Sequence, residues 1–179
     1  MGIEIDDGAH GTSDGAGVKE NRLDVNARMG PRIYYNSRDK GTAFTFLTSY
    51  NVTGSPSYAF YFKNKNLSLD HFVIDHIIVG GAKEGFFELI TVTGDPTGTT
   101  VTGMNANTIS NKTASATTLG EGVSQITEGS KLAHRRSAAY QTTTFSTNNA
   151  RILGQEKAMA VKYTGANGTI DVELLGFWE

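Results

Sequence analysis

The sequence predicts an all-β protein, an antiparallel β-sandwich with an extended N-terminal arm. Its alternating apolar and polar runs are short and are separated by clusters of Gly, Asn, Ser and Pro. Long amphipathic runs of helical period are few, and the chain holds 21 glycines and no cysteine. These features favour a β protein with many turns over an α/β enzyme. We expect one domain, with a flexible tail and interaction arm over residues 1–40 and a sandwich body over residues 41–179.

The most apolar stretch, Leu69 to Thr93, is predicted to be a central hairpin of two long strands. Its turn is the Gly-containing segment 80–85. A period of two predicts two apolar faces on the first strand: Phe72, Ile74 and Ile78 on one, and Val73, Ile77 and Val79 on the other. It likewise predicts Phe86, Ile90 and Val92 opposite Phe87 and Leu89 on the second. A strand that is apolar on both faces lies inside a sandwich or has its outer face covered by another subunit.

Further strands are predicted on both sides of this stretch. Alternation indicates strands over residues 42–50, 57–63 and 99–104, and a last hairpin over 158–164 and 169–177, whose turn holds Asn167-Gly168. Residues 105–129 are polar and predict a long loop or a weak edge pair, whereas residues 131–141 tolerate a helix best. The total of roughly seven to nine strands suits an antiparallel sandwich.

The N-terminal region divides into a glycine-rich tail and a basic arm. Residues 1–18 hold almost no large apolar side chains, so we expect them to be flexible or ordered by a partner. Residues 19–38 predict an extended arm, because Gly30-Pro31 would stop a helix. Arg and Tyr are typical of protein interfaces, and they also suit nucleic-acid backbones and bases. An edge strand with solvated arginines is the third interpretation. Under the interface hypothesis, the arm lies against a partner chain through Arg22, Leu23, Val25, Arg28, Arg32, Tyr34, Tyr35 and Arg38.

The search for chemistry finds no catalytic motif and predicts neither an enzyme nor a cofactor. There is no Gly-x-Ser-x-Gly elbow and no glycine-rich phosphate loop, and without cysteine no thiolate can bind a metal. His71 and His76 are five residues apart, which predicts imidazoles on opposite faces of a strand and no metal site. The net charge of −2 gives no general attraction to nucleic acid or anionic membrane. No apolar run approaches the roughly 20 residues of a membrane span.

Several segments together resemble small virion structural proteins of tailed bacteriophages. They are Glu20-Asn21-Arg22-Leu23-Asp24-Val25, Arg32-Ile33-Tyr34-Tyr35-Asn36, a cysteine-free body rich in Thr, Asn and Gly, and the terminal Asp171-Val172-Glu173-Leu174. The chain is most similar to those with a jelly-roll body that decorate or cement the capsid. This resemblance implies a homotrimer on the capsid surface, made in the host cytoplasm. It also implies that the partner is the major capsid protein, bound through the arm and one end of the sandwich, and that there are no catalytic residues.

Two other functions remain as alternatives. One is a receptor- or carbohydrate-binding β-sandwich of a phage tail or fibre, which would use Tyr50, Tyr58, Tyr61 or Trp178 as stacking platforms. The other is a jelly-roll metalloenzyme of the cupin type.

Overall fold

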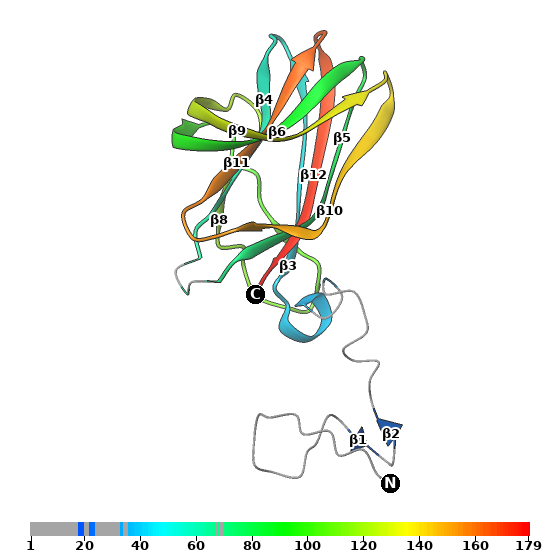
Figure 1. Ribbon diagram of the computed structural model, residues 1–179, viewed down its shortest axis with the longest axis vertical. Helices are drawn as coiled ribbons and strands as arrows, with labels where there is room; N and C mark the ends of the chain where they lie inside the picture. Colours follow the sequence, from blue (N-terminus) through cyan, green and yellow to red (C-terminus); the bar gives the residue numbers. More distant parts are fainter. Residues whose placement is uncertain (1–17, 20–21, 24–32, 34–35, 67, 69) are drawn as a thin grey trace.

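Two antiparallel β-sheets pack face to face in the computed structural model of the protein (Figure 1). The structure describes residues 18–19, 22–23, 33, 36–66, 68 and 70–179. The first sheet, called here the β12 sheet, consists in spatial order of β10 (Gln141–Leu153), β5 (Phe72–Gly81), β12 (Gly168–Trp178), β3 (Ala43–Val52) and β7 (Met104–Asn105). The second, the β11 sheet, consists of β8 (Ala116–Leu119), β4 (Ser57–Asn64), β11 (Ala158–Gly165), β6 (Gly85–Thr97) and β9 (Ser124–Ser137). The sandwich prediction is confirmed.

Among the described residues, three short elements, β1 (Val18–Lys19), β2 (Arg22–Leu23) and η2 (Asn36–Lys40), precede the body. β1 and β2 pair with each other in a separate two-stranded sheet. η2 is a single π-helical turn that leads into β3. No helix among the described residues has the length and hydrophobicity that a membrane crossing requires.

The strand order is that of a jelly roll. The chain changes sheet at each step from β3 through β4 and β5 to β6, and again from β9 through β10 and β11 to β12. Between these two runs, β6 pairs with β9 in the same sheet. Two interlocked Greek keys of this kind give a sandwich of two four-stranded sheets, here extended at one edge of each by β7 or β8.

Both predicted hairpins are wrong as pairings, although their strands exist. β5 pairs with β10 and β12, whereas β6 pairs with β11 and β9. β11 and β12 likewise lie in different sheets. A short Gly or Asn-Gly connection suits a corner between two sheets as well as a hairpin. Local turn chemistry therefore could not reveal that the neighbours of each strand come from elsewhere in the chain.

A β-bulge in β5 also changes the predicted faces of that strand. Ile74 pairs with Gly176 and His76 pairs with Leu175, which leaves Asp75 as an extra residue. One inserted residue reverses the alternation beyond it. The core side of β5 consequently holds Phe72, Ile74, Ile77 and Val79, while Val73 and Ile78 lie on the outer side, so the predicted sets are mixed. On β6 the two faces are confirmed, with Phe87 and Leu89 in the main core and Ile90 and Val92 in a second cluster, but Phe86 is exposed and lies against His134.

The remaining local predictions have mixed outcomes. The strands predicted over 42–50 and 57–63 are confirmed as β3 and β4. Residues 131–141 are not helical, because most of them belong to β9 and pair with β6. The strand predicted over residues 99–104 does not form. Thr100 makes an isolated bridge with Leu119, and Met104 is the first residue of the two-residue strand β7. Residues 105–129 contain β8 and the start of β9 between loops.

One end of the core is held by a buried amide and a group of aromatic rings. The fully buried Asn64 donates hydrogen bonds from Nδ2 to the carbonyl oxygens of Asp70 and Leu153, at 3.0 and 2.9 Å. Its Oδ1 accepts a hydrogen bond from the indole N–H of Trp178 at 3.0 Å. The ring of Phe72 lies against Trp178, with centroids 4.6 Å apart. A buried amide with all these partners costs little to desolvate and joins β4, β10 and β12.

Candidate functional site

The outer face of the β11 sheet is covered by the protein's own chain. Tyr61, Ile90 and Ala160 point away from the main core, yet each is at most 1 % exposed. They pack in a second cluster with Leu119, Val123 and other apolar residues of β6, β11 and the chain before β9. Around Ile90 this face therefore buries its apolar side chains without a partner, whereas Phe86, on the same side of β6, is 42 % exposed.

The polar groups on the same face are also paired within the chain. Glu128 Oε1 accepts hydrogen bonds from Lys162 Nζ at 2.6 Å and from the phenol of Tyr58 at 2.7 Å. The bonds from Lys162 and then Tyr58 lower the pKa of the Glu128 carboxyl. Burial, followed by the adjacent Glu128, raises the pKa of Tyr58 to about 12. Glu84 and Glu88 form ion pairs with Arg136 and Lys131, respectively.

The described residues cover the outer face of the β12 sheet at one end. There the buried Ala43, Val73 and Phe177 form a small cluster against which Ile33 packs. The turn η2 contacts β3 and β12 at the same end. Farther along the sheet, where Asp171 of β12 pairs with Gly80 of β5, this cover is absent among the described residues.

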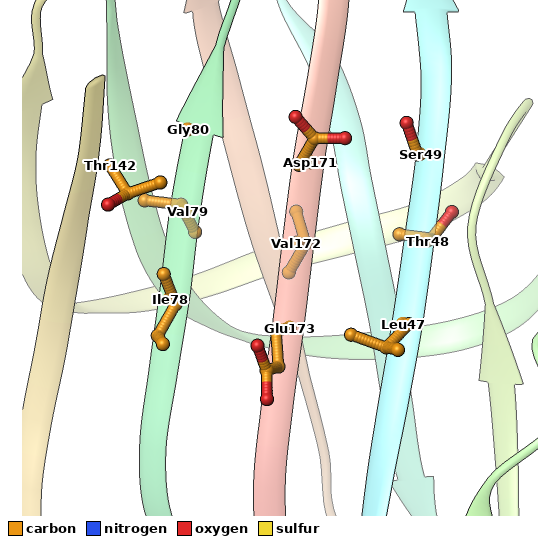
Figure 2. Close-up of a pocket in the computed structure, with 10 residues that line it drawn as sticks. All are labelled: Leu47, Thr48, Ser49, Ile78, Val79, Gly80, Thr142, Asp171, Val172 and Glu173. Atoms are coloured by element: carbon orange, nitrogen blue, oxygen red, sulfur yellow. The ribbon is translucent and has the colours of Figure 1, made fainter. Parts of the chain in front are cut away.

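The uncovered part is a shallow groove of about 490 Å³ across β3, β12, β5 and β10 (Figure 2). Asp171 and Glu173 present their carboxylates from β12 (Figure 2). Leu47 on β3 is 48 % exposed, and Ile78 on β5 is half-buried. The full lining is Leu47, Thr48, Ser49, Ile78, Val79, Gly80, Thr142, Asp171, Val172 and Glu173. We call this surface the acidic groove.

No described residue supplies a counter-ion to the negative charge of the acidic groove. None of its lining residues is Lys or Arg. Within the described part of the chain, neither Asp171 nor Glu173 forms an ion pair, unlike Glu84 and Glu128 on the opposite sheet. Two carboxylates beside exposed apolar side chains suit a slender ligand that bears both cationic and apolar groups.

The predicted partner-binding residues lie almost entirely outside what the structure describes. Arg22 and Leu23 form β2, and Arg38 lies in η2, but the structure does not describe their side chains. The other five, Val25, Arg28, Arg32, Tyr34 and Tyr35, fall outside the described residues. Their role stays a prediction. Ile33 was expected to be buried by a partner with the rest of the arm, but it packs against its own body, so the root of the arm belongs to the sandwich.

The prediction that His71 and His76 lie on opposite faces of a strand depended on unbroken alternation between them. The bulge at Asp75 breaks the alternation, so the placement of His71 and His76 on opposite faces is wrong as reasoned. His76 Nδ1 lies 2.8 Å from Asp75 Oδ2, and His71 is exposed. Among the described residues, no three His, Asp or Glu side chains gather closely enough to hold a metal ion.

The aromatic residues proposed as sugar platforms are turned inward. Tyr61 and Trp178 are 1 % and 4 % exposed, and Tyr58 packs against the second cluster. Tyr50 packs against the main core and donates its hydroxyl hydrogen bond to the carbonyl of Tyr58. Tyr61 and Trp178 therefore offer no exposed ring for stacking, whereas Tyr50 and Tyr58 are partly buried.

The chain matches no protein-family model, no curated protein and no solved structure. Its function is therefore inferred from the fold and the surfaces alone. Sequence reasoning did not single out the acidic groove. The signal was present in Asp171 and Glu173, whose spacing of two predicts one shared face, but only the structure shows that this face is uncovered.

Proposed function

We propose that this protein is a non-enzymatic structural protein of a virion, a jelly-roll decoration or cement protein on the head of a tailed bacteriophage. It binds the major capsid protein as a homotrimer and stabilises the capsid lattice. The observation that carries this proposal is a sheet face that the described residues leave open, in a chain that also has a basic N-terminal segment, because an assembly protein must offer its neighbours a surface that its own chain does not cover.

The jelly-roll topology supports the proposal in general terms only. This arrangement occurs in viral capsid proteins, and also in lectins and cupins. The inward position of Tyr61 and Trp178 weakens the lectin alternative that was built on them. The body also offers a rigid end for contact with a particle, where short loops meet.

That end is built from the connections β3–β4, β5–β6, β9–β10 and β11–β12. The Tyr140 N–H donates a hydrogen bond to the carbonyl of Gly81, and the Ala82 N–H to that of Thr169, both at 2.8 Å. The Gly165 N–H donates to Ser55 Oγ at 3.1 Å. The Tyr140 ring, 83 % exposed, projects from this braced end. Exposed tyrosine on rigid backbone is a common anchor of protein interfaces.

Co-sedimentation with tailed-phage heads stripped of their decoration protein tests the proposal. We expect the full-length chain to saturate the particles at a fixed ratio to the major capsid protein and to raise their resistance to heat or low salt. Tyr140→Ser should weaken this binding about ten-fold or more if the loop end makes the contact. Ile109→Ser, at a residue 92 % exposed elsewhere, is the matched control and should leave it unchanged.

Deletion of residues 1–32 tests the arm in the same assay. The deletion stops before Ile33 because that side chain packs on the body. We expect a folded protein that no longer binds particles. Full-strength binding by the truncated chain would place the contact wholly on the body, and failure of the intact chain to bind heads would overturn the proposal.

A receptor- or carbohydrate-binding role in a tail or fibre is the second candidate, and one feature favours it. A polar hollow at the opposite end of the sandwich is lined by Asn66, Asp70, Asn111 and neighbouring residues. Amides and carboxylates of this kind hydrogen-bond to sugar hydroxyls. Binding on a glycan array that Asp70→Ala abolishes would support this role over decoration of the capsid.

A further inference from the structure

The acidic groove lacks the cations that balance carboxylates elsewhere on the molecule. Asp171 and Glu173 alternate along β12, so their Cα atoms are about 7 Å apart on one face. Like charges this close repel each other, and a bound cation removes the repulsion. On the β11 sheet the chain supplies such a cation itself, as Lys162 does for Glu128.

A second copy of the same face is excluded as the occupant by charge. Two-fold packing of one acidic groove on another would bring four carboxylates together without a counter-ion from either groove. The occupant must instead carry positive charge, and it must be narrow enough to lie along a shallow groove flanked by Leu47 and Ile78.

The chain contains a segment with this chemistry. Residues 19–32 hold Arg22, Arg28 and Arg32, with Leu23 and Val25 between the first two, and with Lys19 their four cations outnumber the two carboxylates of Glu20 and Asp24. Guanidinium groups form bidentate hydrogen bonds with carboxylates. The apolar side chains of the segment match the exposed Leu47 and the half-buried Ile78. Charge and apolar character are thus complementary between two regions of one sequence.

We infer that residues 19–32 of one copy bind the acidic groove of a neighbouring copy. β1 and β2 form a separate two-stranded sheet that joins neither sheet of the body. The nine residues 24–32 connect β2 to Ile33 and span at most about 30 Å when extended, so Arg22 and Leu23 can lie that far from the body against which Ile33 packs. Such a contact is head-to-tail. It closes into a ring, such as a trimer, when the rotation that relates successive copies adds up to a full turn.

This inference goes beyond the proposed function, since copies would bind each other in the absence of any particle. It assigns the arm to contacts between copies and leaves the loop end around Tyr140 to face the particle. The loss of particle binding expected on deleting the arm would then come from the loss of multivalency.

Disulfide trapping in the full-length chain tests the inference, and the absence of cysteine makes each introduced thiol unique. One chain carries Ser49→Cys in the groove, and a second chain of different tagged mass carries Asn26→Cys in the arm. After mixing and mild oxidation without particles, we expect a heterodimer several-fold more abundant than either homodimer. Asn21→Cys and Gly30→Cys repeat the test at other positions along the arm.

Charge removal in the groove supplies the decisive comparison. Asp171→Asn with Glu173→Gln on the Ser49→Cys chain should lower the heterodimer yield about ten-fold or more. Asp95→Asn with Glu121→Gln, a matched pair at exposed positions outside the groove, should leave the yield unchanged. Circular dichroism checks that each variant folds.

Three results would each overturn the inference. The first is the absence of heterodimer above background at all three arm positions. The second is a yield that does not respond to removal of the groove carboxylates. The third comes from a chain carrying both Ser49→Cys and Asn26→Cys: a disulfide that forms within one chain regardless of dilution would show that the arm binds its own groove.

Discussion

The two sheets of the sandwich have the same architecture but opposite outer faces. On the β11 sheet, Ile90 points outward and is nevertheless 1 % exposed, because its own chain packs over it. On the β12 sheet, Ile78 also points outward but lines an open groove. The difference comes from the chain that follows β6. It returns across the β11 sheet through Leu119 and Val123, whereas Ile33 and η2 cover only one end of the β12 sheet.

The electrostatics of the two faces differ in the same way. Glu128 on the β11 sheet has a lysine and a tyrosine within hydrogen-bonding distance, while the described residues give Asp171 and Glu173 no cationic partner. Around Ile90 and Glu128 the first face is completed within the chain, both in packing and in charge. The other has the composition of a surface that receives a partner, so substitutions on the two faces should separate stability from assembly.

The largest effect is expected from truncating the covered isoleucine. Ile90→Ala should lower the free energy of unfolding by about 2–4 kcal/mol, because it leaves a cavity that the cluster cannot fill. Ile78→Ala is the matched control on the open face and should cost about 1 kcal/mol or less. Urea denaturation measures both. Equal losses would mean that the two faces are buried alike.

A smaller loss is expected at the covered end of the β12 sheet. Ile33→Ala should lower the free energy of unfolding by about 1–2 kcal/mol, because it uncovers Val73 and Phe177. Ile109→Ala, at the 92 % exposed site, should change it little. Thermal unfolding provides the measurement. An Ile33→Ala variant with unchanged stability would show that Ile33 is not part of the folded body.

The charged pairs on the covered face should produce a modest pH dependence. Because the folded state lowers the pKa of Glu128, its contribution is present above the unfolded value of about 4.3 and is lost as the pH falls through the folded pKa. Glu128→Gln should cost about 1 kcal/mol or less near neutral pH, since the carboxylate is partly solvated. This cost should shrink in acid. A cost that stays constant with pH would contradict the assignment to the ion pair.

The smallest effect on stability is expected from the Tyr58 phenol beside Glu128, whose contribution is lost only at high pH. The raised pKa of Tyr58, about 12, means that its contribution is present below the unfolded value of about 10 and is lost as the pH rises through 12. Tyr58→Phe should remove the phenolate absorbance that develops near pH 12. If that absorbance component persists in the variant, another tyrosine is its source.

Much of the strand content followed from the sequence alone. β3 and β4 lie where period-two alternation predicted them, and the last two strands, β11 and β12, do as well. Polar, glycine-containing segments lie between them. The reason is local: a residue's propensity and its alternation with its neighbours determine whether a short segment can be a half-buried strand. The basic character of the arm is also a property of its residues, independent of any fold.

Only the tertiary structure decided which strands are neighbours and which face is open. β12 pairs with β3, which lies more than a hundred residues earlier, and no local signal records that pairing. The extra residue at Asp75 reverses the faces of half of β5, which alternation counted from sequence cannot detect. Whether Ile90 or Ile78 stays exposed depends on where the chain after β6 packs. Side-chain alternation specifies two faces for a strand, but only contacts with distant segments decide which of them is covered.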